Sequence, residues 1–270
     1  WFRVPEIIEV RLDGEAQKGV YPKDVILEVL GRIRADGAVY KAIDFTGSYV
    51  EKLNVAGRMT ICNMAVEMGA KTAYMQPNAD VLNYVDKRAV RPYEVQFTDP
   101  DFQYEESYVF DVSKIEPNLA CPSSVENVHP LSEVVANGPI KLNQGYIGSC
   151  TGGRVEDIAI AAKILKGRHI PEYTRLIVVP ASNEVMQECM KAGYIQDLMN
   201  AGATITTPGC GACLGAHEGI LAPGEVCITS TNRNFPGRMG STEALMYLAS
   251  PATVAASMVN GCITDPRDFL

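Results

Sequence analysis

The chain has 270 residues, of which 47% are hydrophobic, and it carries a formal net charge of −8. A chain of this length can bury a large core and is expected to form one or two domains. The acidic balance argues against a nucleic-acid-binding surface, because phosphate binding requires a basic patch. Neither a membrane-spanning apolar run nor a signal peptide is visible. Because the chain begins at Trp1 rather than Met, we interpret it as a piece of something longer.

Strand and helix patterns alternate in the first half of the chain. Residues 7–12 alternate apolar and polar side chains like a half-buried strand, and residues 23–34 have the apolar spacing of a helix. A polar, turn-rich stretch follows at 91–108, and the prolines of 116–130 predict a linker or domain boundary. The other elements predicted here are strands at 41–45, 71–75 and 108–112, a helix at 54–68 that ends before Gly69, and a helix near 79–88.

The second half has a more regular rhythm of strand, turn and helix. This rhythm predicts a mostly parallel sheet with helices on both faces. We therefore expect an α/β protein with two α/β/α domains, residues 1–127 and 128–270. The predicted strands of the second half are 145–147, 176–179, 204–206 and 226–229, and the predicted helices are 155–166, 183–201 and 242–259.

The cysteine content indicates the redox environment. Eight cysteines are too few for a disulfide scaffold at this length. Most of them have apolar neighbours, as buried free thiols do. A reducing cytoplasm is therefore the expected compartment.

Three of the cysteines lie in two glycine-rich turns. Cys150 follows one predicted strand, and Cys210 and Cys213 form a Cys-x-x-Cys pair after another. Ligands bind beyond the carboxyl ends of the strands in parallel sheets, so these turns can converge on one crevice. Three thiolates around one point suit an iron–sulfur cluster with one iron left free for substrate.

The residues alone leave other interpretations of these cysteines open. A zinc site would add His217 as a fourth ligand. A thioredoxin-like dithiol normally opens a helix directly after a strand. Finally, the Cys-x-x-Cys pair could be a packing feature to which Cys150 is unrelated. The glycine-rich flanks do not distinguish zinc from iron–sulfur.

Two arginines follow the last strand of the second half. Arg233 and Arg238 are five residues apart across a Pro-Gly turn, and Asn232 directly precedes them. Guanidinium groups bind carboxylates with bidentate geometry, so this pair suits a di- or tricarboxylate substrate beside a metal. The simpler interpretation is surface salt bridging, which is the usual role of arginine.

Asn63 and Glu67 are spaced i,i+4 on a predicted helix that is apolar almost all round. That spacing places both side chains on one face. A lone carboxylate there would be costly if it were buried unpaired. Glu67 therefore either pairs with Arg58, which the spacing alone slightly favours, or points into a polar site and assists an iron-bound water or hydroxyl. We assign no catalytic role to the histidines, His129, His169 and His217.

Taken together, these motifs resemble the aconitase superfamily, and most closely the large subunits of 3-isopropylmalate dehydratases and their homoaconitase relatives. The resemblance runs over nearly the whole chain and rests on the order and spacing of four motifs. It implies an aconitase-like fold that corresponds to the second and third domains of the large subunit. The motifs are 58–67, the pair of cysteine turns counted as one, 230–238 and 247–251.

The resemblance also implies a cofactor and a reaction. The cofactor is one [4Fe–4S] cluster per subunit, held by Cys150, Cys210 and Cys213, with one iron open to substrate. The reaction dehydrates a 2-hydroxy di- or tricarboxylate and rehydrates it at the neighbouring carbon. The first expectation is 2-isopropylmalate to 3-isopropylmalate in leucine biosynthesis, with homocitrate or dimethylmalate as alternative substrates. By motif match, Asn63 and Glu67 contact the hydroxyl or water, and Asn232, Arg233 and Arg238 hold the substrate carboxylates and neighbouring groups.

The chain departs from the family pattern in two ways. Gly152 stands where the family usually has Asn, which leaves the local contacts and the exact substrate open. The family's N-terminal domain and its swivelling domain, which carries a serine base, are absent from this sequence. We therefore expect a truncated large subunit that requires a small subunit bearing the swivelling domain and is inactive alone. The alternatives from other classes are a zinc-stabilised binding module without catalysis and a thiol–disulfide oxidoreductase.

Overall fold

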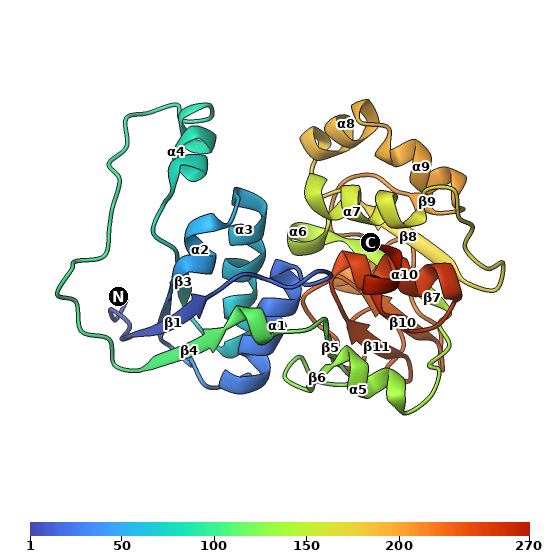
Figure 1. Cartoon of the computed structure of the whole chain (residues 1–270), viewed down its shortest axis with the longest axis horizontal. Helices are drawn as coiled ribbons and strands as arrows, with labels where there is room; N and C mark the ends of the chain where they lie inside the picture. Colours follow the sequence, from blue (N-terminus) through green and yellow to red (C-terminus); the bar gives the residue numbers. More distant parts are fainter.

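The computed structural model describes all residues, 1–270, as two α/β halves that lie side by side (Figure 1). The first half is built on a four-stranded sheet in which every neighbouring pair is parallel, in the order β3-β2-β1-β4. Its elements are β1 (Ile7–Asp13), α1 (Pro22–Ile33), β2 (Ala42–Thr46), α2 (Ser48–Lys52), α3 (Val55–Met64), a 3₁₀ turn (Ala65–Met68), β3 (Thr72–Tyr74), α4 (Ala79–Asp86) and β4 (Ser107–Asp111).

The second half is built on a seven-stranded sheet in the order β6-β5-β11-β10-β7-β8-β9. The five strands from β11 to β9 are parallel, whereas β5 and β6 add an antiparallel edge. Its elements are β5 (Asn118–Ala120), β6 (Val128–Pro130), α5 (Leu131–Ala136), β7 (Gln144–Gly148), α6 (Ser149–Gly152), α7 (Val155–Leu165), β8 (Arg175–Val179), α8 (Asn183–Lys191), α9 (Tyr194–Asn200), β9 (Thr204–Ile205), β10 (Val226–Thr229), β11 (Leu245–Leu248) and α10 (Pro251–Asn260).

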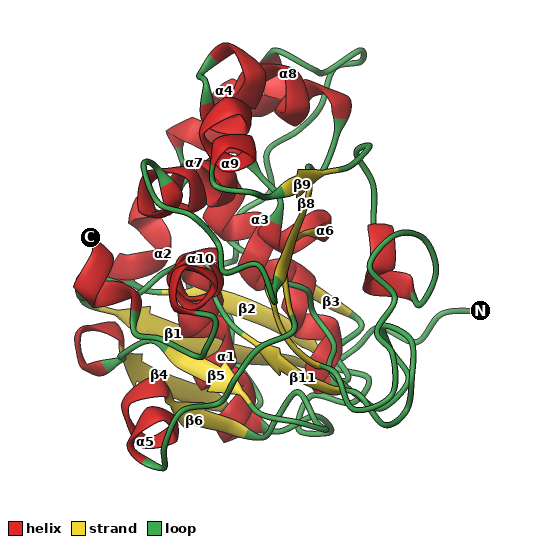
Figure 2. Ribbon diagram, turned by 90° about the vertical axis from the view of Figure 1, so that its right-hand side faces the viewer, coloured by secondary structure: helices red, strands yellow, loops and turns green.

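These sheets confirm the expected mixed α/β class with mostly parallel strands. β1 buries Ile8, Val10 and Leu12 completely, as its alternating sequence predicts. β8 is buried along nearly its whole length, as a central parallel strand should be. Figure 2 shows helices α4, α8 and α9 gathered at one end of the molecule, beyond the strands. No helix of the chain is both long enough and apolar enough to cross a bilayer.

Three predicted elements are corrected by the structure. The single helix predicted over 242–259 is wrong, because 245–248 forms strand β11 and α10 begins only at Pro251, a residue suited to the first turn of a helix. The helix predicted over 183–201 breaks at Gly193, whose φ of +80° ends α8 and lets α9 start. The stretch 116–130 is not only a linker, because it contains β5 and β6.

The division of the chain after residue 127 stays a prediction as a domain boundary. In the sheets themselves, the crossing comes earlier, because β5 already pairs with β11 of the second sheet. Leu119 of β5 belongs to the core of the second half, whereas Ala120 packs into the core of the first half. The segment that connects the halves is therefore packed into both cores and is not a free linker.

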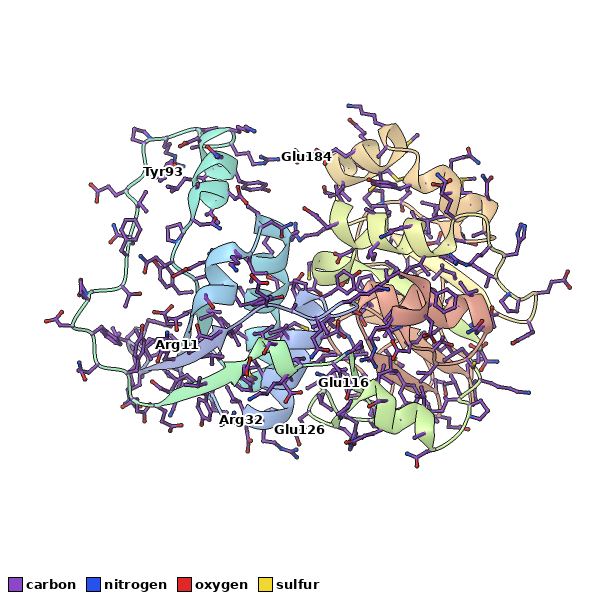
Figure 3. The ribbon with its side chains drawn as sticks, in the orientation of Figure 1. Arg11, Arg32, Tyr93, Glu116, Glu126 and Glu184 are labelled. Carbon is purple, nitrogen blue, oxygen red and sulfur yellow. The ribbon has the colours of Figure 1, made fainter.

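Ion pairs join segments near the boundary between the halves (Figure 3). Arg88 pairs with Glu184 at 2.5 Å, between the end of α4 and α8. At the opposite side, Arg34 pairs with Glu126 at 2.8 Å. Both pairs are partly exposed, and exposed pairs contribute only about 0–1 kcal/mol each. They therefore contribute little to the stability of the contact between the halves.

Candidate active site between the two halves

The Cys150 turn follows the central strand β7 without a connecting loop. β7 ends at Gly148 and α6 begins at Ser149, which has a φ of +72°. A positive φ is uncommon for a residue other than glycine, and it reverses the chain sharply here. The result is a Cys150 thiol that is exposed at the tip of the turn, beyond the carboxyl end of the sheet.

The segment after β10 holds this turn from one side. The hydroxyl of Ser230 accepts a hydrogen bond from the Gly148 N–H at 3.0 Å and donates to the Gly152 carbonyl at 3.2 Å. A Cβ at residue 152 would lie 2.3 Å from the Ser230 Oγ, far inside contact distance. The absence of a side chain at residue 152 therefore leaves the space that Ser230 occupies in this packing.

Helix α3 of the first half holds the same turn from the other side. The Thr60 hydroxyl lies 3.1 Å from the Thr151 carbonyl and donates to it. Asn63 lies one turn further along α3 and is half-buried. The contact between α3 and α6 brings the predicted helix motif of the first half to the cysteine turn of the second half.

The second cysteine turn is attached to the sheet by Tyr146 of β7. The Tyr146 hydroxyl donates to the Cys210 carbonyl at 2.6 Å. Cys210 directly precedes a 3₁₀ turn (Gly211–Leu214), in which Cys213 is buried. Burial, followed by the neighbouring thiols of Cys213 and Cys150, raises the pKa of Cys210 to about 12. The thiol of Cys210 therefore lies within electrostatic range of the other two thiols.

Glu67 of the first half pairs with Arg233 of the second half. The Arg233 Nε lies 2.8 and 3.0 Å from the two carboxylate oxygens of Glu67, whose side chain is only 9% exposed. Burial raises the pKa of Glu67, and the charges of Arg233, Lys23 and Arg238 oppose that rise. The predicted pair between Glu67 and Arg58 is wrong.

Arg58 has other partners. Its guanidinium donates to the backbone carbonyls of Leu53, Gln76 and Val50 at 3.0, 2.9 and 2.7 Å. Arg58 therefore holds together the backbone segments on either side of α3. Glu67 is free to face the second half.

Asn232 and Arg238 complete the constellation. The Asn232 amide nitrogen lies 4.0 Å from the Cys150 sulfur, and its oxygen accepts from the Thr151 hydroxyl. The Arg238 guanidinium lies over the Phe235 ring at 5.7 Å, and its Nε is buried without a hydrogen-bond partner. A buried donor of this kind is costly unless an acceptor arrives. The positive charge of Arg238 also acts on Glu67 and Cys210.

The zinc alternative lacks its fourth ligand in this structure. His217 is exposed, and its Nδ1 contacts the carboxylate of Glu218 instead of the thiols. No group of three His, Cys, Asp or Glu side chains is arranged to hold a single metal ion. His129, in β6, has its Nε2 3.0 Å from the Asn127 Oδ1, and His169 is exposed.

Lys23 and Tyr146 are site neighbours that sequence reasoning missed. Lys23 lies in the first turn of α1, where a cation opposes the helix dipole, and that unfavourable placement was the available signal. Tyr146 gave no signal, because a tyrosine in an apolar strand looks like an ordinary core residue.

Comparisons with known proteins show the family of the chain. The model of the aconitase family (aconitate hydratase) matches residues 1–261. The chain belongs to the aconitase family. It is 49% identical to the probable methanogen homoaconitase large subunit of Methanothermobacter thermautotrophicus, over 99% of this chain and 62% of that protein. It is 51% identical to 3-isopropylmalate dehydratase large subunit 1 of Methanopyrus kandleri, over 100% of this chain and 64% of that protein.

This member of the aconitase family thus spans less than two thirds of the length of these two relatives. Among solved structures, aconitase X of Thermococcus kodakaraensis in its holo form matches with a TM-score of 0.46 and 11% identity, over 88% of this chain and 54% of that chain.

Proposed function

We propose that this chain is the cluster-binding part of a hydro-lyase large subunit, and that Cys150, Cys210 and Cys213 hold a [4Fe–4S] cluster. The support is the placement of the three thiols, which come from two turns beyond one parallel sheet, with the thiols of Cys213 and Cys150 both raising the pKa of Cys210. Thiolates are the soft ligands that iron–sulfur clusters use. Iron binds thiolates, so cluster binding would favour the ionised form of the Cys210 thiol, whose pKa the neighbouring groups raise.

The proposed reaction is the isomerisation of a 2-hydroxy di- or tricarboxylate by loss and return of water. Arg233 and Arg238 supply guanidinium groups next to the cysteine turns, and one of them has a buried donor without an acceptor. We assign 2-isopropylmalate as the substrate. Homocitrate is the second candidate, because relatives named for both activities match at nearly equal identity, 51% and 49%.

The chain's own residues have separable roles in this reaction. When bound, the cluster supplies a Lewis-acidic iron for the substrate hydroxyl. Glu67, whose pKa is raised by burial, can hold or release a proton at its carboxylate. Asn63 and Asn232 orient the hydroxyl and the cysteine turn.

The two arginines have a different task. Arg233 keeps the Glu67 carboxylate in place, and Arg238 stabilises negative charge that develops on the substrate carboxylates. A fixed donor of this kind is worth about 3–4 kcal/mol of transition-state stabilisation.

We further propose a small subunit with a swivelling domain as the partner that completes the site. The chain alone would then be inactive, although it would still bind the cluster. Cluster binding by the chain alone and turnover by the complete complex can therefore be measured separately.

Anaerobic reconstitution with ferrous iron and sulfide tests the proposal. We expect about four iron and four sulfide per chain after gel filtration. One zinc per chain without sulfide would instead support the zinc-stabilised binding module. Activity is then measured on 2-isopropylmalate, homocitrate and dimethylmalate with and without the small subunit. Normal turnover by the chain alone would contradict the need for a partner.

A further inference from the structure

A lysine is buried between the two halves, behind the proposed site. Lys23 is only 2% exposed. Its ammonium donates to the Thr231 carbonyl at 2.6 Å and lies 3.2 Å from the Met64 sulfur. Both partners are neutral. A buried ammonium held by a carbonyl and a thioether, rather than by a carboxylate, is costly to the fold and calls for an explanation.

The two partners of Lys23 adjoin the residues proposed to bind substrate. Thr231 directly precedes Asn232 and Arg233, and Met64 directly follows Asn63. Thr231 is itself fixed, because its N–H donates to the Thr229 hydroxyl at 3.1 Å. Lys23 therefore ties the substrate-binding segment of the second half to α1 and α3 of the first.

The charges that face Lys23 are all negative when ionised. They belong to Glu67, Asp157 and Asp24 and to the thiols of Cys150 and Cys213. Burial nevertheless lowers the pKa of Lys23 to about 8, so the side chain is mostly charged at pH 7. A site that gathers thiolates, a carboxylate and an anionic substrate needs such fixed positive charge.

We propose that Lys23 is a positioning residue of this site, which anchors the Thr231–Arg233 segment and balances the negative charge of the bound cluster and substrate. The anchoring part stands on the contacts of this chain alone. The charge-balancing part rests on the proposed function.

Two variants separate the charge of Lys23 from its bulk. Lys23→Met keeps a long unbranched side chain but removes the charge and the hydrogen bond. Lys23→Arg keeps the charge, and a cavity of about 160 Å³ that Lys23 itself lines, together with Asp157, gives room for the larger group. Lys52→Met is the matched control, because Lys52 belongs to the same half and its side chain is 63% exposed.

Hydrogen exchange of the metal-free chain tests the anchoring. We expect the backbone amides of 230–234 to exchange at least ten-fold faster in Lys23→Met, while those of β1 keep their wild-type rates. Lys23→Arg and Lys52→Met should match the wild type. Unchanged exchange at 230–234, or a uniform increase over both halves, would overturn the anchoring role.

The reduction potential of the reconstituted cluster tests the charge. Loss of a nearby positive charge disfavours the added electron, so Lys23→Met should shift the potential to more negative values, with Lys23→Arg close to the wild type. A cluster of unchanged potential in Lys23→Met would overturn the charge-balancing role. If the wild type takes up no iron, the proposed function and the charge-balancing role fall together, and the exchange measurement still decides the anchoring.

Discussion

The two cysteine turns of this chain are built in opposite ways. The Cys150 turn leaves a central strand of the sheet and is held by Ser230 on one side and Thr60 on the other. The Cys210 turn follows β9, which is only two residues long and lies at the edge of the sheet. Its side-chain attachment to the sheet is one hydrogen bond, from Tyr146 to the Cys210 carbonyl.

The backbone around the second turn is also less regular. Gly209, Gly211, Gly215 and Gly219 all have positive φ, and no strand is formed between β9 and β10. The difference suggests a division of labour. In the proposed site, the Cys150 ligand would be held by the fold. The other two ligands would lie on a segment that cluster binding orders, so that part of the binding free energy would go into ordering that segment.

Removal of the fixed ligand should have the largest effect. In Cys150→Ala we expect no stable cluster after reconstitution, because two thiolates on one adaptable turn cannot hold it. Iron and sulfide analysis measures this directly. Cys62→Ala is the control, since Cys62 is a half-buried thiol on α3 and should leave the iron content unchanged. A full complement of iron in Cys150→Ala would show that the ligand assignment is wrong.

The rigidity of the Cys150 turn can be tested with a single methyl group. In Gly152→Ala the new Cβ would meet the side chain and backbone of Ser230 at 2.3–2.7 Å, and we expect a loss of about 3 kcal/mol in unfolding free energy, the upper range for overpacking. Gly138→Ala is the control, because nothing lies within 4 Å of its Cβ position and only its positive φ, +110°, costs about 1 kcal/mol. Urea unfolding gives both values. Equal losses would refute the tight packing at residue 152.

The buried charge of Lys23 gives a pH-dependent prediction. Burial lowers its pKa from the usual 10.5 to about 8. Between these values the unfolded chain holds a proton that the folded chain has released, so the contribution of this group to stability rises as the pH rises. Below pH 8 both states are protonated, and the folded chain bears the whole cost of the buried charge, about 3 kcal/mol for a shift of this size.

Lys23→Met removes that cost and its pH dependence. The unfolding free energy of the variant minus that of the wild type should therefore be most positive near pH 7 and fall as the pH increases from about 8 to about 10.5. Urea titrations at three pH values measure the difference, in which the other titrating groups cancel. A difference that does not change with pH would mean that folding does not change the pKa of Lys23.

The local patterns of the sequence predicted the regular elements well and the contacts between them poorly. Alternation at 7–12 and the apolar run at 176–179 gave their strands, because each depends only on neighbouring residues. The apolar run 245–248 is equally compatible with a helix, and only its pairing with β10 makes it a strand. Such pairing is not encoded locally.

The same distinction holds for the candidate site. The cysteines, Asn232 and Arg233 could be named from their turns after strands, because parallel strands end at one edge. The partner of Glu67 could not be named from the sequence, because Arg233 is 166 residues away and Arg58 is closer along the chain. Lys23 was hidden for a related reason, because its burial is created only when the two halves meet.

Tyr146→Phe should produce the smallest effect and the one most confined to a single turn. The variant loses the hydrogen bond to the Cys210 carbonyl without changing the bulk of a fully buried ring, at a cost of about 1 kcal/mol. We expect faster alkylation of Cys210 and Cys213 in the metal-free chain, with the rate at Cys150 unchanged, because the Cys150 turn has its own anchors. Mass spectrometry of iodoacetamide-treated protein reports each thiol separately.

Tyr247→Phe is the matched control for this measurement, since Tyr247 lies in β11 of the same sheet and away from the cysteine turns. It should leave all three rates at their wild-type values. If Tyr146→Phe instead accelerates Cys150 as much as Cys213, the two turns are coupled through β7. Their independence, on which the division between a fixed ligand and an adaptable pair depends, would then have to be abandoned.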